Sequence, residues 1–180
     1  MALAVISGSL PTGFIGNNND SYGITANAAI FESGYCGANE NNDPVTSNNG
    51  SYNYNRDVRW EITENGGKIG QTNKPAYTLV IKGSGAIADF ESNTFCPWYQ
   101  YAENITDVVI LDGVTSIGKN AFSNSEHENG HFDNLRIVCI GKDVRKIDKS
   151  AFEDCTKLSY IWVEDENTLI SNNTWNVYKG

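Results

Sequence analysis

An internal repeat in the second half of the sequence constrains the fold more than any other feature. Three copies share one spacing of apolar residues: Ile105-x-x-Val108-x-Ile110, Leu135-x-x-Val138-x-Ile140 and Leu158-x-x-Ile161-x-Val163. The second and third copies are 23 residues apart. The first and second are 30 apart, because seven extra residues lie between Phe122 and Leu135. One such unit cannot bury its apolar residues alone, so the repeat predicts a stack of units around a continuous core.

The repeat also predicts what each unit contains. A period of about 20–29 residues with LxxLxL spacing is typical of a leucine-rich-repeat solenoid, in which each unit supplies a short strand and a turn. Two copies continue with a second short apolar piece, Val114-x-x-Ile117 and Val144-x-x-Ile147. Both then reach an Ala-Phe pair, Ala121-Phe122 and Ala151-Phe152, where we expect brief helical or 3-10 turns.

The first half of the sequence is richer in turn-forming residues. Residues 1–55 contain eleven Asn and no Lys or Arg, which favours loops with short strands. Residues 58–62 alternate as a strand, Asn65-Gly66-Gly67 predicts a turn, and residues 77–81 predict the partner strand of a hairpin. The predicted fold class is therefore mainly β, with a β-rich N-terminal cap leading into a short leucine-rich-repeat solenoid.

Particular motifs resemble the BspA-like (treponemal-type) leucine-rich repeat family over residues 35–165. They are the segments 113–122 and 144–158, together with the cap-like pieces Cys36-Gly37, Val58-Arg59-Trp60 and Pro97-Trp98-Tyr99. We divide the chain accordingly into an unassigned Asn-rich segment packing on the cap (1–34), the cap (35–104), and the repeats with an atypical closing repeat (105–180). The resemblance implies an extracellular or cell-surface bacterial module that binds other molecules without catalysis.

Charge and apolar content exclude several functions. The formal net charge is −9, so the chain lacks the basic field that nucleic-acid binding requires, and we expect no nucleic-acid partner. Docking on anionic lipid is disfavoured for the same reason. No apolar run approaches the roughly 20 residues that span a bilayer, so we expect no membrane insertion.

Candidate metal and redox chemistry is weak. His127-Glu128-Asn129-Gly130-His131 matches the zinc motif HExxH, but Asn-Gly is a turn dipeptide and the motif lies in the inserted segment. We therefore expect an exposed loop there, and predict no enzyme, metal site or cofactor. The four cysteines either form one or two disulfides outside the cell or remain thiols: Cys36, Cys96, Cys139 and Cys155.

The outward-facing positions of the predicted strands supply the candidate binding residues. Aligning the strands gives one outward row of Val80, Val109, Cys139 and Trp162, and a second row of Thr78, Asp107, Ile137 and Tyr160. If exposed, this apolar face would dock a partner protein or a second copy of the chain. Alternatively a sugar ring would stack on Tyr160 and Trp162, with hydrogen bonds from Asp107 and Arg136. In a third interpretation, residues 1–55 fold back and bury the face.

These observations lead to two functional hypotheses. The main one is a non-catalytic extracellular recognition or adhesion module that binds a protein or glycan ligand through the strand face. The alternative is a carbohydrate-binding module of a polysaccharide-degrading system.

Overall fold

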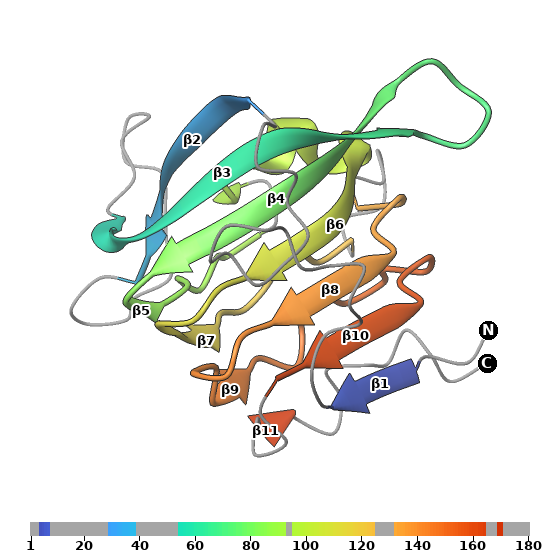
Figure 1. Ribbon diagram of the computed structural model, residues 1–180. Helices are drawn as coiled ribbons and strands as arrows, with labels where there is room; N and C mark the ends of the chain where they lie inside the picture. Colours follow the sequence, from blue (N-terminus) through green and yellow to red (C-terminus); the bar gives the residue numbers. More distant parts are fainter. Residues whose placement is uncertain are drawn as a thin grey trace.

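The computed structural model describes residues 4–7, 29–38, 54–92, 95–124, 132–164 and 169–170, and places them in two β-sheets. The larger sheet has the strand order β1-β10-β8-β6-β4-β3-β2, and the smaller has the order β11-β9-β7-β5 (Figure 1). In chain order the elements are β1 (Ala4–Ser7), β2 (Ile30–Gly37), β3 (Asn55–Lys68), β4 (Pro75–Gly83), β5 (Gly85–Ala86), the 3-10 helix η3 (Tyr99–Asn104), β6 (Ile105–Ile110), β7 (Val114–Ile117), β8 (Ile137–Ile140), β9 (Lys146–Ile147), β10 (Tyr160–Val163) and β11 (Leu169–Ile170). The mainly β repeat fold predicted from the sequence is confirmed.

The three copies of the repeat lie side by side as parallel strands of the larger sheet. Val108 in β6 pairs with Val138 in β8, and Val138 pairs in turn with Ile161 in β10. All three side chains are fully buried. The spacings of 30 and 23 residues therefore give the same strand register, and the seven extra residues leave the pairing unchanged.

Short turns lead from β4 to β5, from β6 to β7 and from β8 to β9, so the chain passes repeatedly from the larger sheet to the smaller one. Ile117 in β7 pairs with Ile147 in β9, as the repeat spacing predicts. After β9 the backbone makes successive hydrogen bonds between residues three apart, from Ala151 N–H to the Asp148 carbonyl and from Glu153 N–H to the Ser150 carbonyl. These are 3-10-type turns in a segment that does not form a continuous helix.

A column of stacked aromatic rings joins the cap to the repeats. Phe122 and Phe152, from the two Ala-Phe pairs, stack with ring centroids 5.0 Å apart, and Trp98 stacks on the other face of Phe122 at 5.4 Å. The indole Nε1 of Trp98 donates a hydrogen bond of 3.0 Å to the Ala121 carbonyl. Trp60 is also buried and meets Trp98 edge-on at 6.3 Å. One hydrophobic core therefore runs through both regions.

The hairpin of β3 and β4 differs from its predicted form. Asn65-Gly66-Gly67 was expected to be the turn, but β3 continues through it to Lys68, and the chain reverses only afterwards. The pairing of β3 with β4 is irregular between Glu64 and Lys68, and Gly66 has a φ of 79°. Asn-Gly-Gly therefore forms a β-bulge, for which a glycine with positive φ is well suited. The hairpin consequently extends beyond the body of the sheet (Figure 1).

Two described parts of the segment 1–34 lie at opposite edges of the larger sheet. β1 pairs in parallel with β10, beyond the last described repeat strand, and β2 pairs antiparallel with β3 in the cap. The sheet itself crosses the boundary between residues 104 and 105, because β4 of the cap pairs directly with β6. Cap and repeats thus share one sheet and one core.

Candidate functional site

The two outward rows predicted from the sequence are present in the sheet. Cross-strand pairing aligns Val80, Val109, Cys139 and Trp162 in one row, and Thr78, Asp107, Ile137 and Tyr160 in the other. The second row lies nearer the ends at which the parallel strands begin. The rows differ in exposure, and this difference decides where a ligand can bind.

The first row does not form an open platform. Val109, Cys139 and Trp162 are only 7%, 3% and 7% exposed, and they form a second apolar cluster, with Leu111 and Ile137 packed against it. The expectation of an exposed apolar face is therefore not met at these three positions. The interpretation that residues 1–55 bury the face falls largely on residues outside the described ranges. Cys139 and the other three cysteines are buried free thiols.

The sequence carried a signal for this burial. Parallel strands that are covered on both faces contain continuous apolar runs, whereas strands with one solvated face alternate apolar and polar residues. The runs 108–110, 138–140 and 161–163 are each apolar at all three positions. From the outward rows alone, exposure and burial of the middle residue of each run both remained open, although the unbroken runs indicated burial on both sides.

The second row remains accessible. Tyr160 is 53% exposed, and its pairing neighbour Ile137 is half-buried. The Tyr160 amide donates a hydrogen bond of 3.1 Å to the Arg136 carbonyl, which places the aromatic residue beside the chain that carries Arg136. Tyr160, Ile137, Asp107 and Arg136 are therefore brought together near the strand starts, apart from the buried Trp162.

Asp107 is held in place by polar neighbours from two regions. The Asn65 amide Nδ2 donates a hydrogen bond of 2.7 Å to Asp107 Oδ2, and the Thr106 hydroxyl donates to the same oxygen. Burial raises the pKa of the Asp107 carboxyl, while these hydrogen bonds and the nearby positive charge of Arg136 lower it, with burial the larger effect. Asn65 lies in the Asn-Gly-Gly bulge, so the irregularity in β3 positions this amide.

A groove lies at the starts of the parallel strands, and we call it the strand-start groove. Its volume is about 330 Å³. One wall comes from the end of β3 and the following turn: Lys68, Ile69, Gly70 and Thr72. The other comes from β6 and the residues that precede β8 and β10: Thr106, Asn134, Arg136 and Lys157. The groove is thus formed jointly by the cap hairpin and the repeats.

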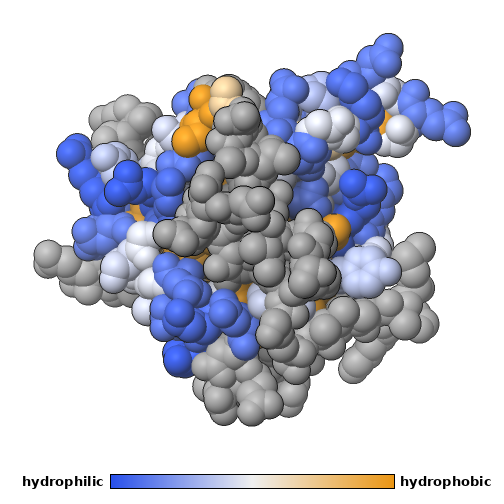
Figure 2. All heavy atoms as spheres, viewed as in Figure 1, coloured by the Kyte–Doolittle hydropathy of each residue, from blue (hydrophilic) through white to orange (hydrophobic). Residues whose placement is uncertain are grey.

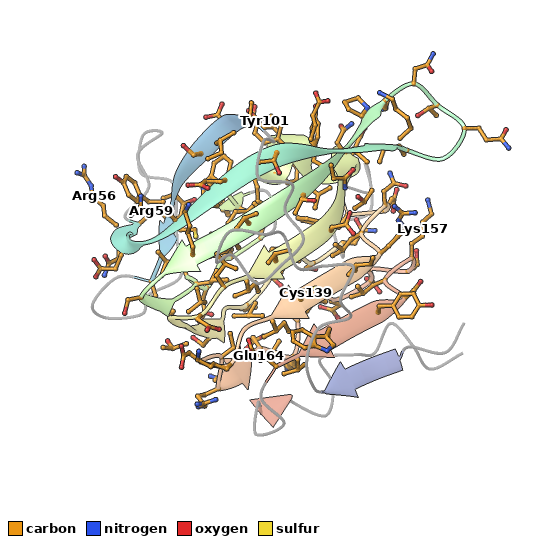
Figure 3. The ribbon with its side chains drawn as sticks, viewed as in Figure 1. Arg56, Arg59, Tyr101, Cys139, Lys157 and Glu164 are labelled. Atoms are coloured by element: carbon orange, nitrogen blue, oxygen red, sulfur yellow. The ribbon has the colours of Figure 1, made fainter. Side chains whose placement is uncertain are left out.

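Positive charge and neutral polar groups line this groove. Lys68, Arg136 and Lys157 are exposed, and none of the lining residues is acidic. Lys157 Nζ donates a hydrogen bond of 3.0 Å to Asn134 Oδ1, and Asn134 Nδ2 donates one of 2.9 Å to the Glu103 carbonyl. Figure 3 shows Lys157 below the projecting hairpin, and Figure 2 shows that the hairpin surface is hydrophilic. The groove therefore suits a polar ligand.

Sequence reasoning found Arg136 but missed most of this groove. Asn134 and Lys157 occupy equivalent positions, 23 residues apart in successive repeats, immediately before the strands. Comparing these pre-strand positions, as we compared the strand positions, would have found them. Nothing in the sequence pairs Lys68 and Thr72 with residues some 60–90 positions later, because only the extended hairpin brings them there.

A comparison with protein families identifies the repeats. The model of the BspA type leucine-rich repeat region, with six copies, matches residues 90–179. The chain belongs to this family. The BspA-type match begins within the cap as we defined it, at Phe90, and so includes Trp98 of the aromatic column.

Comparisons with individual proteins add little. A solved structure, a leucine-rich repeat protein from Eubacterium ventriosum ATCC 27560, is 26% identical with a TM-score of 0.46. The match covers 60% of this chain and 24% of the Eubacterium protein. This chain therefore spans about a quarter of the length of that protein. No curated protein matches the chain.

BspA-type repeats are generally non-catalytic recognition domains, and proteins that contain them are typically secreted or displayed on bacterial surfaces. Within the part of the chain that the structure describes, no helix is long and apolar enough to cross a membrane. The described residues also contain no group of three or more His, Cys, Asp or Glu suited to a metal ion. The HExxH sequence at 127–131 lies outside the described residues.

Proposed function

We propose that this chain is a non-catalytic recognition module of a secreted or surface-displayed bacterial protein, and that its ligand binds at the strand-start groove. The observation that carries the proposal is the groove itself. It combines about 330 Å³ of space with cationic and neutral polar side chains from two separate parts of the chain. Ligand sites are typically concavities of roughly 300–1,000 Å³ with a few convergent polar groups.

The burial of the first row moves the expected contact from the middle of the strand face to its edge. Docking a flat apolar partner surface on Val109 and Trp162 would require both to become accessible, and they are 7% exposed. At the strand starts, a ligand reaches Tyr160, Asp107 and Arg136 without any such change. These three residues from the original hypothesis remain candidate contacts, and Ile137 contributes a half-buried apolar edge.

Carbohydrate binding is the second candidate, and the exposure of Tyr160 favours it. Tyr160 is 53% exposed and offers a ring for stacking, while the groove lined by Arg136 supplies amide, hydroxyl and guanidinium groups for sugar hydroxyls. With Trp162 buried, the aromatic platform is Tyr160 alone. The carbohydrate-binding hypothesis therefore depends on polar contacts in the groove more than on stacking.

Array binding tests whether this end of the sheet recognises anything. Three labelled proteins are compared: wild type, Tyr160→Ala and Tyr35→Ala. Each is applied to printed neutral and acidic glycans and to purified extracellular-matrix proteins. Tyr35 is a matched control, because it is 43% exposed but lies on β2, at the opposite edge of the sheet from β10. We expect the wild-type protein to bind at least one array ligand. Tyr160→Ala should bind that ligand more weakly, and Tyr35→Ala should bind it as wild type does. Failure to bind any feature, or equal binding by all three proteins, would overturn the proposal.

A further inference from the structure

We infer that the strand-start groove binds a negatively charged polysaccharide, whose carboxylate or sulfate groups are held by Arg136, Lys157 and Lys68. The inference rests on the proposed function and names the ligand class for the same site. It begins from an asymmetry of charge. The whole chain has 22 acidic and 13 basic residues, yet the groove is lined by three basic residues and no acidic one.

The positive groups in the groove are available to a ligand. Among the described residues, the salt bridges join other lysines to carboxylates: Lys74 to Glu103, Lys82 to Glu61 and Lys142 to Asp112. Lys68 and Arg136 take part in none of them, and the ammonium of Lys157 bonds the neutral amide oxygen of Asn134. A bound anion would therefore gain charge-assisted hydrogen bonds without first breaking an ion pair.

Asp107 is an acidic group close to this positive cluster. It is half-buried, and one of its carboxylate oxygens already accepts hydrogen bonds from Asn65 and Thr106. Arg136 acts on it electrostatically but forms no salt bridge with it. The three basic lining residues and an ionised Asp107 together sum to about +2, and at physiological ionic strength charges more than about 8 Å from the groove are largely screened.

The neutral lining residues favour a sugar chain over an acidic peptide. Thr72 and Asn134 present hydroxyl and amide groups of the kind that bond sugar hydroxyls, and the backbone of Tyr160 is hydrogen-bonded to that of Arg136, another lining residue. Peptides commonly bind by adding a strand to a free sheet edge. Here β6 and β8 are paired on both sides, so the strands below the groove offer a peptide no free backbone edge.

The repeat geometry also suits a polymer. Asn134 and Lys157 precede adjacent parallel strands, which lie about 4.8 Å apart in a sheet. That spacing is close to the length of one sugar ring. A polysaccharide lying across the strands would therefore present successive rings, and their charges, to successive repeats.

Titration calorimetry with four probes of similar length tests the inference. The probes are oligogalacturonate, a heparin-derived oligosaccharide, a neutral oligoglucan and oligoglutamate. We expect one or both charged sugars to bind, and the binding to weaken as salt is raised from about 50 to 500 mM. Tight oligogalacturonate binding would identify carboxylated chains, and tight heparin binding sulfated ones.

Two charge-matched double variants locate the site. Arg136→Gln/Lys157→Gln removes two charges from the groove, and Lys146→Gln/Lys149→Gln removes two exposed charges elsewhere. We expect the first to lower affinity about tenfold or more, and the second to change it less than about twofold. Circular dichroism checks that both fold.

Other outcomes overturn the inference and separate it from the proposed function. Equal losses in the two double variants, equal binding of the neutral oligoglucan, or tighter binding of oligoglutamate would each refute a groove selective for charged sugars. If neither charged sugar binds but an array ligand is lost in Tyr160→Ala, the inference fails and the proposed function stands. If both experiments find no binding, both fail.

Discussion

The aromatic column that joins the cap to the repeats makes a specific prediction about cooperativity. Phe122 is fully buried between two stacked rings, Trp98 at 5.4 Å and Phe152 at 5.0 Å, and Phe132 meets it edge-on at 5.9 Å. Replacing Phe122 by Ala removes a whole ring from the middle of the column. Changes of this type usually cost about 3–5 kcal/mol, the larger values where the surroundings cannot collapse into the cavity.

Collapse around residue 122 is restricted by hydrogen bonds on both sides. Trp98 is fixed by its bond to the Ala121 carbonyl, and the Cys155 thiol donates to the Phe122 carbonyl at 3.0 Å. We therefore expect Phe122→Ala to lower the free energy of unfolding by about 4 kcal/mol. With a urea m-value of about 2 kcal/mol per M, the midpoint falls by about 2 M.

The assay is urea unfolding followed by two probes, tryptophan fluorescence and far-UV circular dichroism. Because the column belongs to one continuous core, we expect the two curves to coincide in wild type and variant. Phe122→Leu keeps much of the volume and should lose about half as much stability or less, and exposed Tyr35→Ala should change it by less than about 1 kcal/mol. A loss below about 1.5 kcal/mol for Phe122→Ala, or separate transitions for the two probes, would refute this account of the core.

Three further predictions concern single residues. Gly83 has a φ of 125°, and a Cβ there would clash with the Asp57 carbonyl oxygen, so Gly83→Ala should cost about 3 kcal/mol or more in urea unfolding. Burial raises the folded-state pKa of Asp107, so the folded protein holds this proton to higher pH than the unfolded chain, and the contribution of Asp107 to stability falls as pH rises above the unfolded pKa of 3.8. Asp107→Asn removes this titration. The free energy of unfolding of the variant minus that of wild type should therefore be larger at pH 7 than at pH 3.5. Burial raises the thiol pKa of Cys139 to about 11, so mass spectrometry should find little iodoacetamide labelling of it in the native protein at pH 8 and full labelling in urea. Rapid native labelling would contradict its burial.

The repeat allowed the strand register to be predicted residue by residue. Cross-strand neighbours such as Asp107 and Ile137 follow from spacing alone, because stacked units must superpose their apolar positions to share a core. Whether Trp162 is buried or exposed could not be predicted from the spacing. The spacing determines which side of the sheet a residue faces but not what covers that side. The chain reversal of the hairpin was misplaced for a local reason, since Asn-Gly-Gly is compatible with both a turn and a bulge.

The groove was difficult to predict because one wall comes from the repeats and the other from a hairpin that is not repeated. Asn134 and Lys157 lie at equivalent positions of successive repeats and could be compared with each other, whereas Lys68 lies in a hairpin that occurs once. Its place depends on how far β3 extends past the bulge, which is a property of the pairing with β4. Long-range contacts of this kind have no local sequence signature.

The burial of both faces of the repeat strands explains why recognition would be concentrated at their ends. Side chains in runs such as 138–140 pack against one apolar cluster or the other, so changing them alters stability before it alters binding. Polar residues just before the strands, such as Asn134, Arg136 and Lys157, belong to neither apolar cluster and can vary at little cost. The facing wall is the non-repeated hairpin turn, so the repeats would set the spacing of ligand contacts while the turn sets their selectivity. Exchanging residues of that turn should therefore change which ligand binds while leaving the repeat stack intact.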